Sequence, residues 1–352
     1  MSKHTCVVIT TINPPTAAVR KFVDMPGLDV IIVADKKTPV DTYAGLDCIL
    51  LTLDEQSRAF PALDALLPFN HYARKNMGYL YAIREGYQVI LETDDDNIPY
   101  DDWLDKSARP ADVSSANLFE VSGHKYINIY RQFSDLNIWP RGLPLRDVLS
   151  TESTGVVTSV DRSPQFFDDM SILQGLADGD PDVDAIFRLT SPLAGSEITF
   201  KQTNAYYKLG AEQFCPGNTQ NTAWLKPADF YLMYVPSYVS FRFCDILKMY
   251  IAQAFVKSSG RSLVFQGATV FQDRNPHDFF KDFQQECEMF LQTEQVVDLI
   301  QSCLHAAGPD ASLQDVFMSL YEQLVVRHVI KDERELALLR CWLDEVSRSK
   351  AA

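Results

Sequence analysis

The sequence predicts an α/β fold with a mostly parallel central sheet and helices on both of its faces. Strand and helix patterns alternate through the first hundred residues, and an acidic triplet directly follows a short apolar strand. From residue 276 onward the patterns are helical. Strands that alternate with helices indicate βαβ units, whose crossover helices cover a parallel sheet.

The first third of the chain supplies these alternating elements. Apolar and alternating runs predict four strands, at residues 5–11, 29–34, 47–53 and 87–92. Helical spacing predicts three helices between them, at residues 14–25, 54–67 and 72–85. Because the carboxyl ends of parallel strands meet at one edge of a sheet, that edge is the expected ligand site.

The rest of the chain changes character twice. Residues 100–240 are irregular and rich in loop-forming residues, with strands expected only at 124–130 and 229–235. A helix and a strand then complete the core, at residues 244–256 and 262–271. Two further amphipathic helices are expected near the C-terminus, at residues 312–329 and 333–346.

Composition excludes several classes of protein. The 352 residues are 46% apolar and 22% charged, as in a folded globular protein. The net charge of −15 argues against a nucleic-acid binder or a protein held on anionic membranes. Apolar runs stay well below the ~20 residues of a membrane span, and the start of the chain has no signal-peptide pattern. Seven scattered cysteines without a Cys-X-X-Cys pair predict free thiols and a cytoplasmic location.

The acidic triplet Asp94, Asp95 and Asp96 is the strongest functional signal. It follows residues 89–91, whose apolar side chains indicate a buried strand. Three carboxylates at a strand end repel one another unless a cation lies among them. Oxygen ligands suit Mg²⁺ or Mn²⁺, which in turn bind substrate phosphates. We therefore expect Asp94 and Asp96 to hold a divalent metal and Asp95 to assist in ligand binding; a solvated acidic turn is the alternative.

Two other strand ends offer polar residues at the same edge of the sheet. Thr11 and Asn13 end the first strand before a helix, and Asp35 and Lys36 end the second. A polar strand end that opens into a helix is a natural place for a nucleotide base, ribose or phosphate. We expect these four residues to contact a nucleotide, with simple helix capping as the alternative at the first strand.

The helix before the triplet begins with two cations, Arg74 and Lys75. Arg74 and Gly78 lie one turn apart on the same face, so a phosphate could approach the arginine where the glycine leaves room. We expect both cations to bind phosphates, and a solvated basic helix start is the alternative.

Four aspartates alternate between residues 178 and 184. The glycine and glutamate spacing of an EF-hand is missing, which argues against a calcium loop of that type. Asp180, Asp182 and Asp184 are candidates for a general base or for a group that orients an acceptor hydroxyl. The sequence does not single out one of them, and a solvated acidic loop is the alternative.

Two later segments add candidates. Arg242 and Asp245 stand three residues apart at a helix start, where we expect a catalytic role, although Asp245 also fits a helix cap. Arg274 and His277 follow the last core strand. Arg274 is expected to help bind the nucleotide sugar, and His277 is a candidate third metal ligand or diphosphate contact, with a structural histidine as the alternative.

Several of these segments, in this order, resemble the STELLO-type glycosyltransferase-like proteins. The resemblance covers roughly residues 5–290 and is carried by residues 72–81, 92–97, 138–145, 175–189 and 220–222. More distantly, the order of motifs is similar to that of the reversibly glycosylated polypeptides, or UDP-arabinopyranose mutases. That similarity is carried by the acidic triplet, the Arg-Gly-X-Pro segment 141–144, residues 180–185, the pair Arg242 and Asp245, and residues 274–276.

The resemblance implies a GT-A fold, in which a divalent metal on Asp94 and Asp96 holds a nucleotide sugar. In the mutase-like relatives, an arginine in the segment that matches residues 141–146 carries a sugar. By position Arg146 is the closer match to that arginine.

We therefore expect an enzyme that moves a sugar from a nucleotide diphosphate sugar, preferably a UDP-sugar, to a glycan or other hydroxyl acceptor, in glycan or polysaccharide synthesis. Residues 1–290 would form its catalytic domain, with 1–100 as the nucleotide-binding half and 101–290 as the acceptor side. Residues 291–352 would form a helical subdomain for packing or homo-oligomerisation. The alternatives are a nucleotide-sugar mutase and a non-catalytic scaffold that binds nucleotide sugars.

Overall fold

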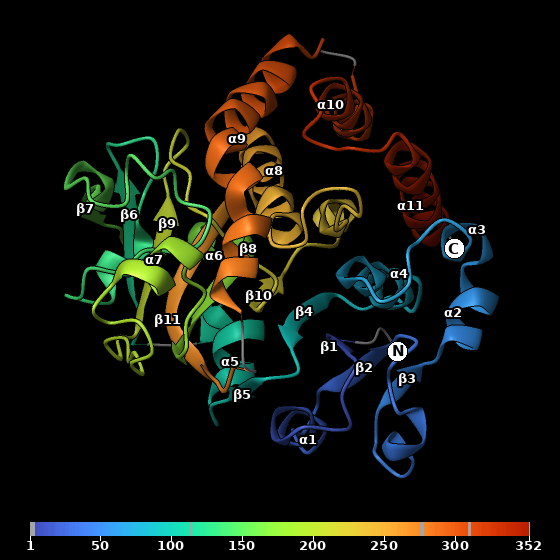
Figure 1. The fold of residues 1–352 in the computed structure, drawn as a ribbon. Coiled ribbons are helices and arrows are strands. Elements are labelled where there is room, and N and C mark those ends of the chain that lie inside the picture. Colours follow the sequence, from blue (N-terminus) through green and yellow to red (C-terminus); the bar gives the residue numbers. More distant parts are fainter. Residues whose placement is uncertain (1–3, 113–114, 275–277, 309–310, 352) are drawn as a thin grey trace.

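The computed structural model describes residues 4–112, 115–274, 278–308 and 311–351, which form a mixed α/β fold around one large sheet (Figure 1). The sheet has eleven strands in the order β3-β2-β1-β4-β10-β8-β11-β9-β6-β7, with β5 paired to β11. The strands are β1 (Thr5–Thr11), β2 (Asp29–Ala34), β3 (Ile49–Leu51), β4 (Val89–Asp94), β5 (Asn97–Pro99), β6 (Asn117–Ser122), β7 (Val156–Ser159), β8 (Met170–Gly179), β9 (Ala205–Leu209), β10 (Asn221–Trp224) and β11 (Ser262–Gln272).

Helices cover both faces of this sheet, as the sequence predicts. The α-helices are α1 (Ala17–Val23), α2 (Leu53–Ala59), α3 (Pro61–Asp64), α4 (Lys75–Arg84), α5 (Trp103–Ala108), α6 (Pro164–Asp168), α7 (Ala185–Thr190), α8 (Cys244–Ser258), α9 (Phe279–Ala306), α10 (Leu313–Val326) and α11 (Arg334–Ala351). Two 3₁₀-helices matter below: η2 (Tyr72–Arg74) and η6 (Pro227–Met233).

The sheet is mixed: its N-terminal part is all parallel, as predicted, whereas the rest combines the parallel pairs β8–β11 and β6–β9 with antiparallel pairs. Strands β3, β2, β1 and β4 are all parallel. The short strand β10 then pairs antiparallel with β4 on one side and with β8 on the other. Since β8 is thereby turned back to the direction of β4, and β11 is parallel to β8, the carboxyl ends of β1, β2, β4, β8 and β11 lie along one edge.

The predicted N-terminal elements are confirmed, with one break. Strands β1 and β2 have the expected bounds, and Thr16 caps α1 by accepting a hydrogen bond from the Val19 amide. The helix expected at 54–67 is two helices, because the proline at position 61 lacks an amide proton and disfavours a helical conformation at Phe60.

Two predicted strands are wrong. Residues 124–130 are all described and form no strand: the Ile127 amide donates to the Phe214 carbonyl and the Asn128 amide to the Ser153 carbonyl, so the backbone bonds go to two different segments. Residues 229–235 lie mostly within η6, which begins at Pro227. Residues 124–130 alternate polar and apolar side chains and residues 229–235 are mostly apolar and buried, but neither pattern fixes the backbone hydrogen-bond partners that a strand needs.

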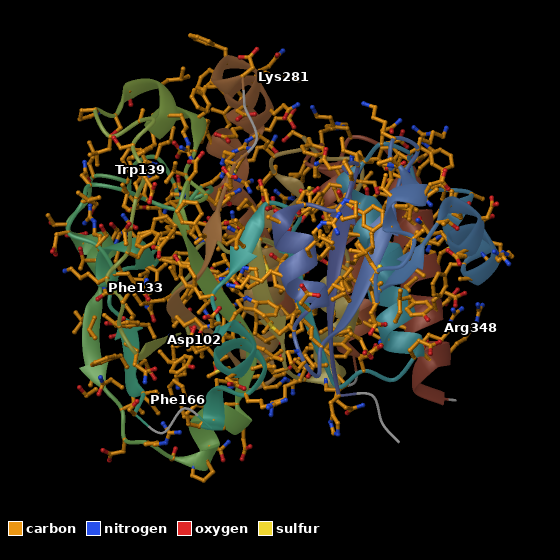
Figure 2. All side chains as sticks on the ribbon, turned by 90° about the horizontal axis from the view of Figure 1, so that it is seen from below. Asp102, Phe133, Trp139, Phe166, Lys281 and Arg348 are labelled. Atoms are coloured by element: carbon orange, nitrogen blue, oxygen red, sulfur yellow. The ribbon has the colours of Figure 1, made fainter. Side chains whose placement is uncertain are left out.

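The segment expected to be irregular also contains a central strand. Residues 170–179 form β8, which is buried along its whole length and lies between β10 and β11. A fully buried strand reads as a continuous run without alternation, so small and polar residues such as Gly175 and Gln174 obscure it in the sequence. Figure 2 shows the two halves that result, with the N-terminal elements on one side and the segment from β6 to β9 on the other.

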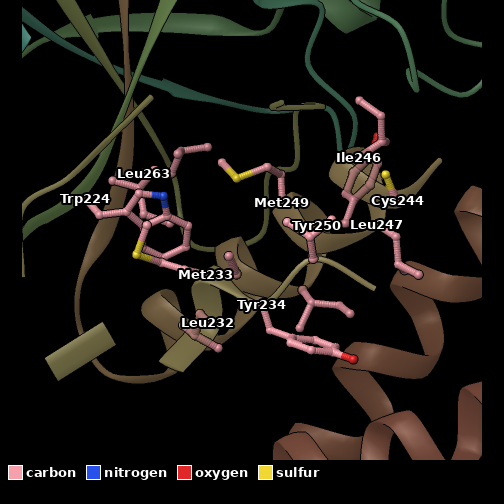
Figure 3. Packing of buried hydrophobic residues seen from close by; sticks show 14 of the residues in the cluster. Trp224, Leu232, Met233, Tyr234, Cys244, Ile246, Leu247, Met249, Tyr250 and Leu263 are labelled. Atoms are coloured by element: carbon pink, nitrogen blue, oxygen red, sulfur yellow. The ribbon is translucent and has the colours of Figure 1, made fainter. Parts of the chain in front are cut away.

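The apolar core has one part on each face of the sheet. On one face α1, α5 and α6 pack against the strands. On the other face lie α4 and α8, together with the C-terminal helices. Figure 3 shows part of this larger cluster, in which Trp224 of β10 and Met233 of η6 lie near Leu263 of β11 and Met249 of α8.

The C-terminal helices share this core with the N-terminal half. Helix α9 runs without a break across the boundary expected at residue 290, and α11 contacts α3 and α4 (Figure 1). Trp342 of α11 is fully buried and donates to the Tyr231 carbonyl at 2.8 Å. The domain boundary and a role of these helices in oligomerisation stay predictions. In the part of the chain that the structure describes, every helix is too short or too polar to span a membrane.

Gly78 lies where α4 crosses the sheet, and we expect Gly78→Ala to destabilise the fold. A Cβ there would come within 2.5 Å of Val8 Cγ1 and 2.6 Å of Val33 Cγ2. Overpacking of this kind costs about 1–3 kcal/mol, which exceeds the gain of about 1 kcal/mol in helix propensity. Urea denaturation measures the change; Arg84→Ala, on an exposed site of the same helix, is the control. An unchanged or raised midpoint for Gly78→Ala would contradict this packing.

Candidate active site

The candidate site lies at the edge where the carboxyl ends of five strands meet. The acidic triplet begins at the last residue of β4, which pairs with Thr10 of β1. The residues after β8 and β11 reach the same edge, as does the segment that leads into β10. Ligands in open α/β sheets bind outside the carboxyl ends of the strands, and here the sheet order brings distant segments of the chain to one place.

Two cavities adjoin at the triplet. The larger cavity, with about 1120 Å³ of open space, lies over the ends of β1 and β2 and is lined by residues that include Thr11, Asn13, Asp35, Lys37 and His71. The smaller cavity, with about 600 Å³, is lined by residues that include Arg141, Asp182, Asn218, Arg242, Asp245, Gln272 and Arg274. Four residues line both: Tyr72, Asp94, Asp96 and Phe241.

Asp95 ties the end of β4 to the loop after β1. Its carboxylate accepts hydrogen bonds from the Thr11 hydroxyl at 2.5 Å and from Asn13 Nδ2 at 2.9 Å. Its carbonyl accepts a third bond from the Thr16 hydroxyl at 2.5 Å. Thr11 and Asn13 therefore lie in the larger cavity, as expected, but part of their hydrogen-bonding capacity is spent on fixing the shape of the triplet.

Asp94 is oriented by neighbours that are more deeply buried. Its Oδ1 accepts from the Tyr72 hydroxyl at 2.7 Å and from Lys75 Nζ at 3.3 Å. Burial and the charge of Asp94 raise the pKa of Tyr72 well above its usual range, so this hydroxyl stays protonated and donates. Neither donor contacts Oδ2, so one carboxylate oxygen of Asp94 is left for a ligand.

Asp96 lies beside the same boundary in an environment that disfavours its charge. Burial, and then the charge of Asp94, raise the pKa of Asp96 to about 7. Gln272 Nε2 at 3.4 Å and the charge of Arg274 oppose that shift. Two carboxylates that repel each other across a cavity boundary are a donor set for a hard divalent cation, whose binding would relieve the repulsion.

The described residues hold no group of three or more histidine, cysteine or carboxylate side chains poised around one metal position. Two carboxylates nevertheless fit Mg²⁺ or Mn²⁺, since such ions keep several waters and take further oxygens from substrate phosphates. His277, the third ligand expected from the sequence, lies outside the described residues.

The three candidate aspartates between residues 180 and 184 lie in different surroundings. Asp184 caps α7 and accepts from Trp139 Nε1 at 2.7 Å, away from both cavities (Trp139 is labelled in Figure 2). Asp180 pairs with Arg188 and Arg274. Of the three candidates, Asp182 alone is brought into the wall of the smaller cavity.

Arg141 joins Asp182 to Asp245, a link the sequence does not reveal. Its Nε and Nη2 donate to Asp182 at 2.8 and 2.9 Å, and Nη2 also donates to Asp245 Oδ2 at 2.8 Å. Asn218 Nδ2 adds a bond to Asp182 at 2.8 Å. Burial would raise the pKa of Asp182, but the charge and hydrogen bonds of Arg141 outweigh it and hold that pKa well below the usual range.

The two arginines of the segment 141–146 therefore differ. Arg141 is nearly buried in the cavity wall, whereas the side chain of Arg146 is 74% exposed and pairs with Glu294 of α9. The position in the sequence favours Arg146 as the match to the sugar-carrying arginine, but the structure brings only Arg141 of these two to the site.

The remaining predicted cations are placed unevenly. Arg242 lines the smaller cavity and pairs with Glu286 at 2.5 Å, and Arg274 lines it too. Lys36 lies over the Phe69 ring, 3.9 Å from its centroid. Arg74 is fully buried, donates to Gln56 and Asp64, and lines neither cavity, so the phosphate contact expected for it has no support in the geometry.

His71 is a cavity residue that the sequence does not indicate. Its Nδ1 accepts from the Ala73 amide at 3.1 Å, and its own amide donates to Asp35 at 3.1 Å. Burial lowers the pKa of His71, which favours the neutral ring and leaves Nε2–H as a donor. Gln272 is a second cavity residue that was not predicted. It could have been, because it is the last residue of β11, and polar residues at strand ends were the signal that identified the aspartates.

The chain is similar in sequence to one known group of proteins. Residues 242–350 match the family model described as STELLO glycosyltransferases. The probable glycosyltransferase STELLO1 of Arabidopsis thaliana is 30% identical over 268 residues, which cover 72% of this chain and 33% of the plant protein. The chain is a relative of the STELLO glycosyltransferases. The probable glycosyltransferase STELLO2 of the same plant is 28% identical over 275 residues, 75% of this chain and 35% of that protein.

The predicted resemblance to STELLO-type proteins is thus confirmed. This STELLO relative spans about a third of the length of the two plant proteins that it matches. The family match begins at Arg242 and so includes Arg242, Asp245 and Arg274 of the smaller cavity, but not the acidic triplet.

The link through Arg141 predicts a large effect on stability. Arg141→Met would leave Asp182 and Asp245 buried without their cation, and breaking a buried pair in this way costs about 3–5 kcal/mol. Arg146→Met, which removes an exposed pair, should cost at most about 1 kcal/mol. Guanidinium denaturation of both variants measures the difference. Equal stabilities would show that Arg141 is not needed to neutralise the two aspartates.

Proposed function

We propose that this chain is a metal-dependent glycosyltransferase of the GT-A type, which moves a sugar from a nucleotide diphosphate sugar to a hydroxyl acceptor. One observation carries the proposal: Asp94 and Asp96 stand at the boundary between two cavities, each of which has the chemistry of one part of the reaction. The relation to proteins named as probable glycosyltransferases supports the same reaction class.

The larger cavity suits the nucleoside of the donor. It offers the apolar side chain of Ile12, which is 48% exposed, together with the polar groups of Asn13, Asp35 and His71. Stacking on an apolar group and a few fixed polar contacts are what nucleoside pockets use. With the nucleoside there, the diphosphate reaches the boundary, and the sugar extends into the smaller cavity. A UDP-sugar is the proposed donor.

Asp94 and Asp96 are the residues that would hold Mg²⁺ or Mn²⁺ at this boundary. When bound, the metal supplies positive charge that stabilises the departing diphosphate. Arg274, at the wall of the smaller cavity, adds a cation on the same side. Asp95 holds the loop in place through Thr11 and Asn13, so it contributes to the shape of the site and not to the coordination.

The acceptor hydroxyl is proposed to bind in the smaller cavity, near Asp245. Asp182 accepts three bonds from Arg141 and Asn218, and its lowered pKa makes it a weak base. Among the side chains that the structure describes, only Arg141 donates to Asp245, at 2.8 and 3.2 Å. Of the aspartates that the sequence offers, Asp245 is therefore the one we assign to the acceptor, either to take its proton or to position it.

Nucleotide binding tests the donor half of the proposal. Calorimetry with UDP, GDP and CDP, each with and without Mn²⁺, should show one nucleotide that binds tightly only with the metal. Asp96→Asn should lower that affinity by roughly tenfold or more, since a neutral amide is a poorer ligand for a hard cation. Asp101→Asn, whose side chain is 98% exposed, is the matched control. An unchanged affinity in Asp96→Asn would show that Asp96 does not bind the metal.

Product analysis tests the reaction class. With the donor alone, a glycosyltransferase should release free sugar slowly by hydrolysis, with water in the place of the acceptor. Asp245→Asn should slow this hydrolysis far more than it weakens donor binding. Arg340→Gln, an exposed substitution in α11, should leave both unchanged. An isomerised donor would point to the nucleotide-sugar mutase, and neither product would favour the scaffold.

A further inference from the structure

We propose that Lys75 is a positioning residue that makes the site bind a divalent metal only together with the diphosphate, and not alone. This inference rests on the proposed function, since it assumes a metal at Asp94 and Asp96. It concerns the ammonium group of Lys75, which lies on the buried side of Asp94. From the sequence alone, this lysine was expected to bind a phosphate.

Lys75 is held in place by oxygens from three parts of the chain. Its Nζ donates to the Thr93 carbonyl at 2.7 Å and to the Tyr72 hydroxyl at 2.8 Å. It lies 3.3 Å from Asp94 Oδ1 and 3.4 Å from the Thr219 carbonyl. The lysine is 0% exposed, so the ammonium cannot reach a ligand in either cavity without leaving these partners.

The position of Lys75 determines how strongly the site attracts a cation. Asp94 keeps about a third of its side chain exposed, on the cavity side, while the ammonium sits on the buried side. A unit charge so close cancels much of the field of one carboxylate, because little water lies between them. Arg274 acts in the same sense on Asp96. Two carboxylates that are each opposed by a cation attract a dication less strongly than the same carboxylates would without those cations.

A nucleotide diphosphate changes this balance. It brings at least two negative charges to the boundary and supplies oxygen ligands of its own, so metal and diphosphate neutralise each other there. The resident lysine then ceases to be an obstacle and keeps Asp94 oriented through Oδ1, with Oδ2 available to the ligand. The expected behaviour is strong mutual dependence: metal and nucleotide each bind weakly alone and tightly together.

Two variants separate the charge of Lys75 from its hydrogen bond. Lys75→Gln removes the charge and keeps a donor, whereas Tyr72→Phe removes a donor to Asp94 Oδ1 and keeps the charge. If the inference holds, Lys75→Gln should bind Mn²⁺ without nucleotide about tenfold more tightly than the wild type, by removal of a neighbouring like charge. Tyr72→Phe should bind Mn²⁺ alone no more tightly than the wild type.

Manganese binding measured by electron paramagnetic resonance, with and without UDP, provides the readout, and thermal melts check that each variant is folded. Equal Mn²⁺ affinity in Lys75→Gln and the wild type, or equal gains in both variants, would overturn the role of Lys75 while leaving the proposed function intact. The wild type alone gives a second test that needs no variant: tight Mn²⁺ binding without nucleotide overturns the inference. Absence of Mn²⁺ binding even with every nucleotide diphosphate overturns both proposals.

Discussion

The rest of the site depends on neutralising the carboxylates that the fold gathers at one edge of the sheet. The wall of the smaller cavity holds four of them, Asp94, Asp96, Asp182 and Asp245. Like charges in a partly dry cavity destabilise the folded chain unless cations accompany them. Lys75 pairs with Asp94 from the buried side, Arg274 lies on the side of Asp96, and Arg141 pairs with both Asp182 and Asp245. The cations are thus part of the structure, and a ligand meets a site whose charges are already arranged.

A second acidic residue of β4, buried in the core beneath the triplet, is also paired with a cation. Glu92, two residues before Asp94 on β4, is fully buried and pairs with Lys248 of α8 at 2.7 Å. Trp224 and Tyr79 complete the hydrogen bonds of that carboxylate. Residues two apart on a strand share a face, so β4 presents a fully neutralised acid to the core and a partly neutralised one to the cavity. A buried pair of this kind fixes the position of α8 relative to β4.

The sequence predicted the parts of the fold and site that rest on local signals. Strands β1 and β2 and the triplet at the end of β4 follow from apolar runs and the residues after them, and the strand-end rule placed Asp94, Asp35 and Thr11 along one edge. It could not reveal that β10 is inserted antiparallel beside β4, because four residues carry little pattern and their partners are distant in the chain. The link from Arg141 to its two aspartates also joins residues that are distant in the chain, so it was missed for the same reason.

The phosphate contacts predicted for Arg74 and Lys75 have no support in the positions of these two residues. Both lie at the start of a helix near the triplet, and both are fully buried. Arginine and lysine are almost never fully buried unless they are paired, and here each has buried oxygen partners. Nothing in a sequence distinguishes a cation that faces solvent or ligand from one that faces a buried oxygen. The distinction is made by η2, whose tight turn sends Arg74 toward Gln56 and Asp64, and Lys75 toward β4.

The C-terminal helices act on the site through this same helix start. Glu335 of α11 accepts the Tyr234 hydroxyl at 2.5 Å and the amides of Ser237 and Tyr238 at 2.9 and 2.8 Å. Between these residues, Val235 exchanges two backbone bonds with the side chain of Asn76, the neighbour of Lys75. The position of α4, and with it the charge below Asp94, is therefore set partly by α11. The stretch 242–350 that matches the STELLO family therefore supports the start of α4 as well as lining the smaller cavity.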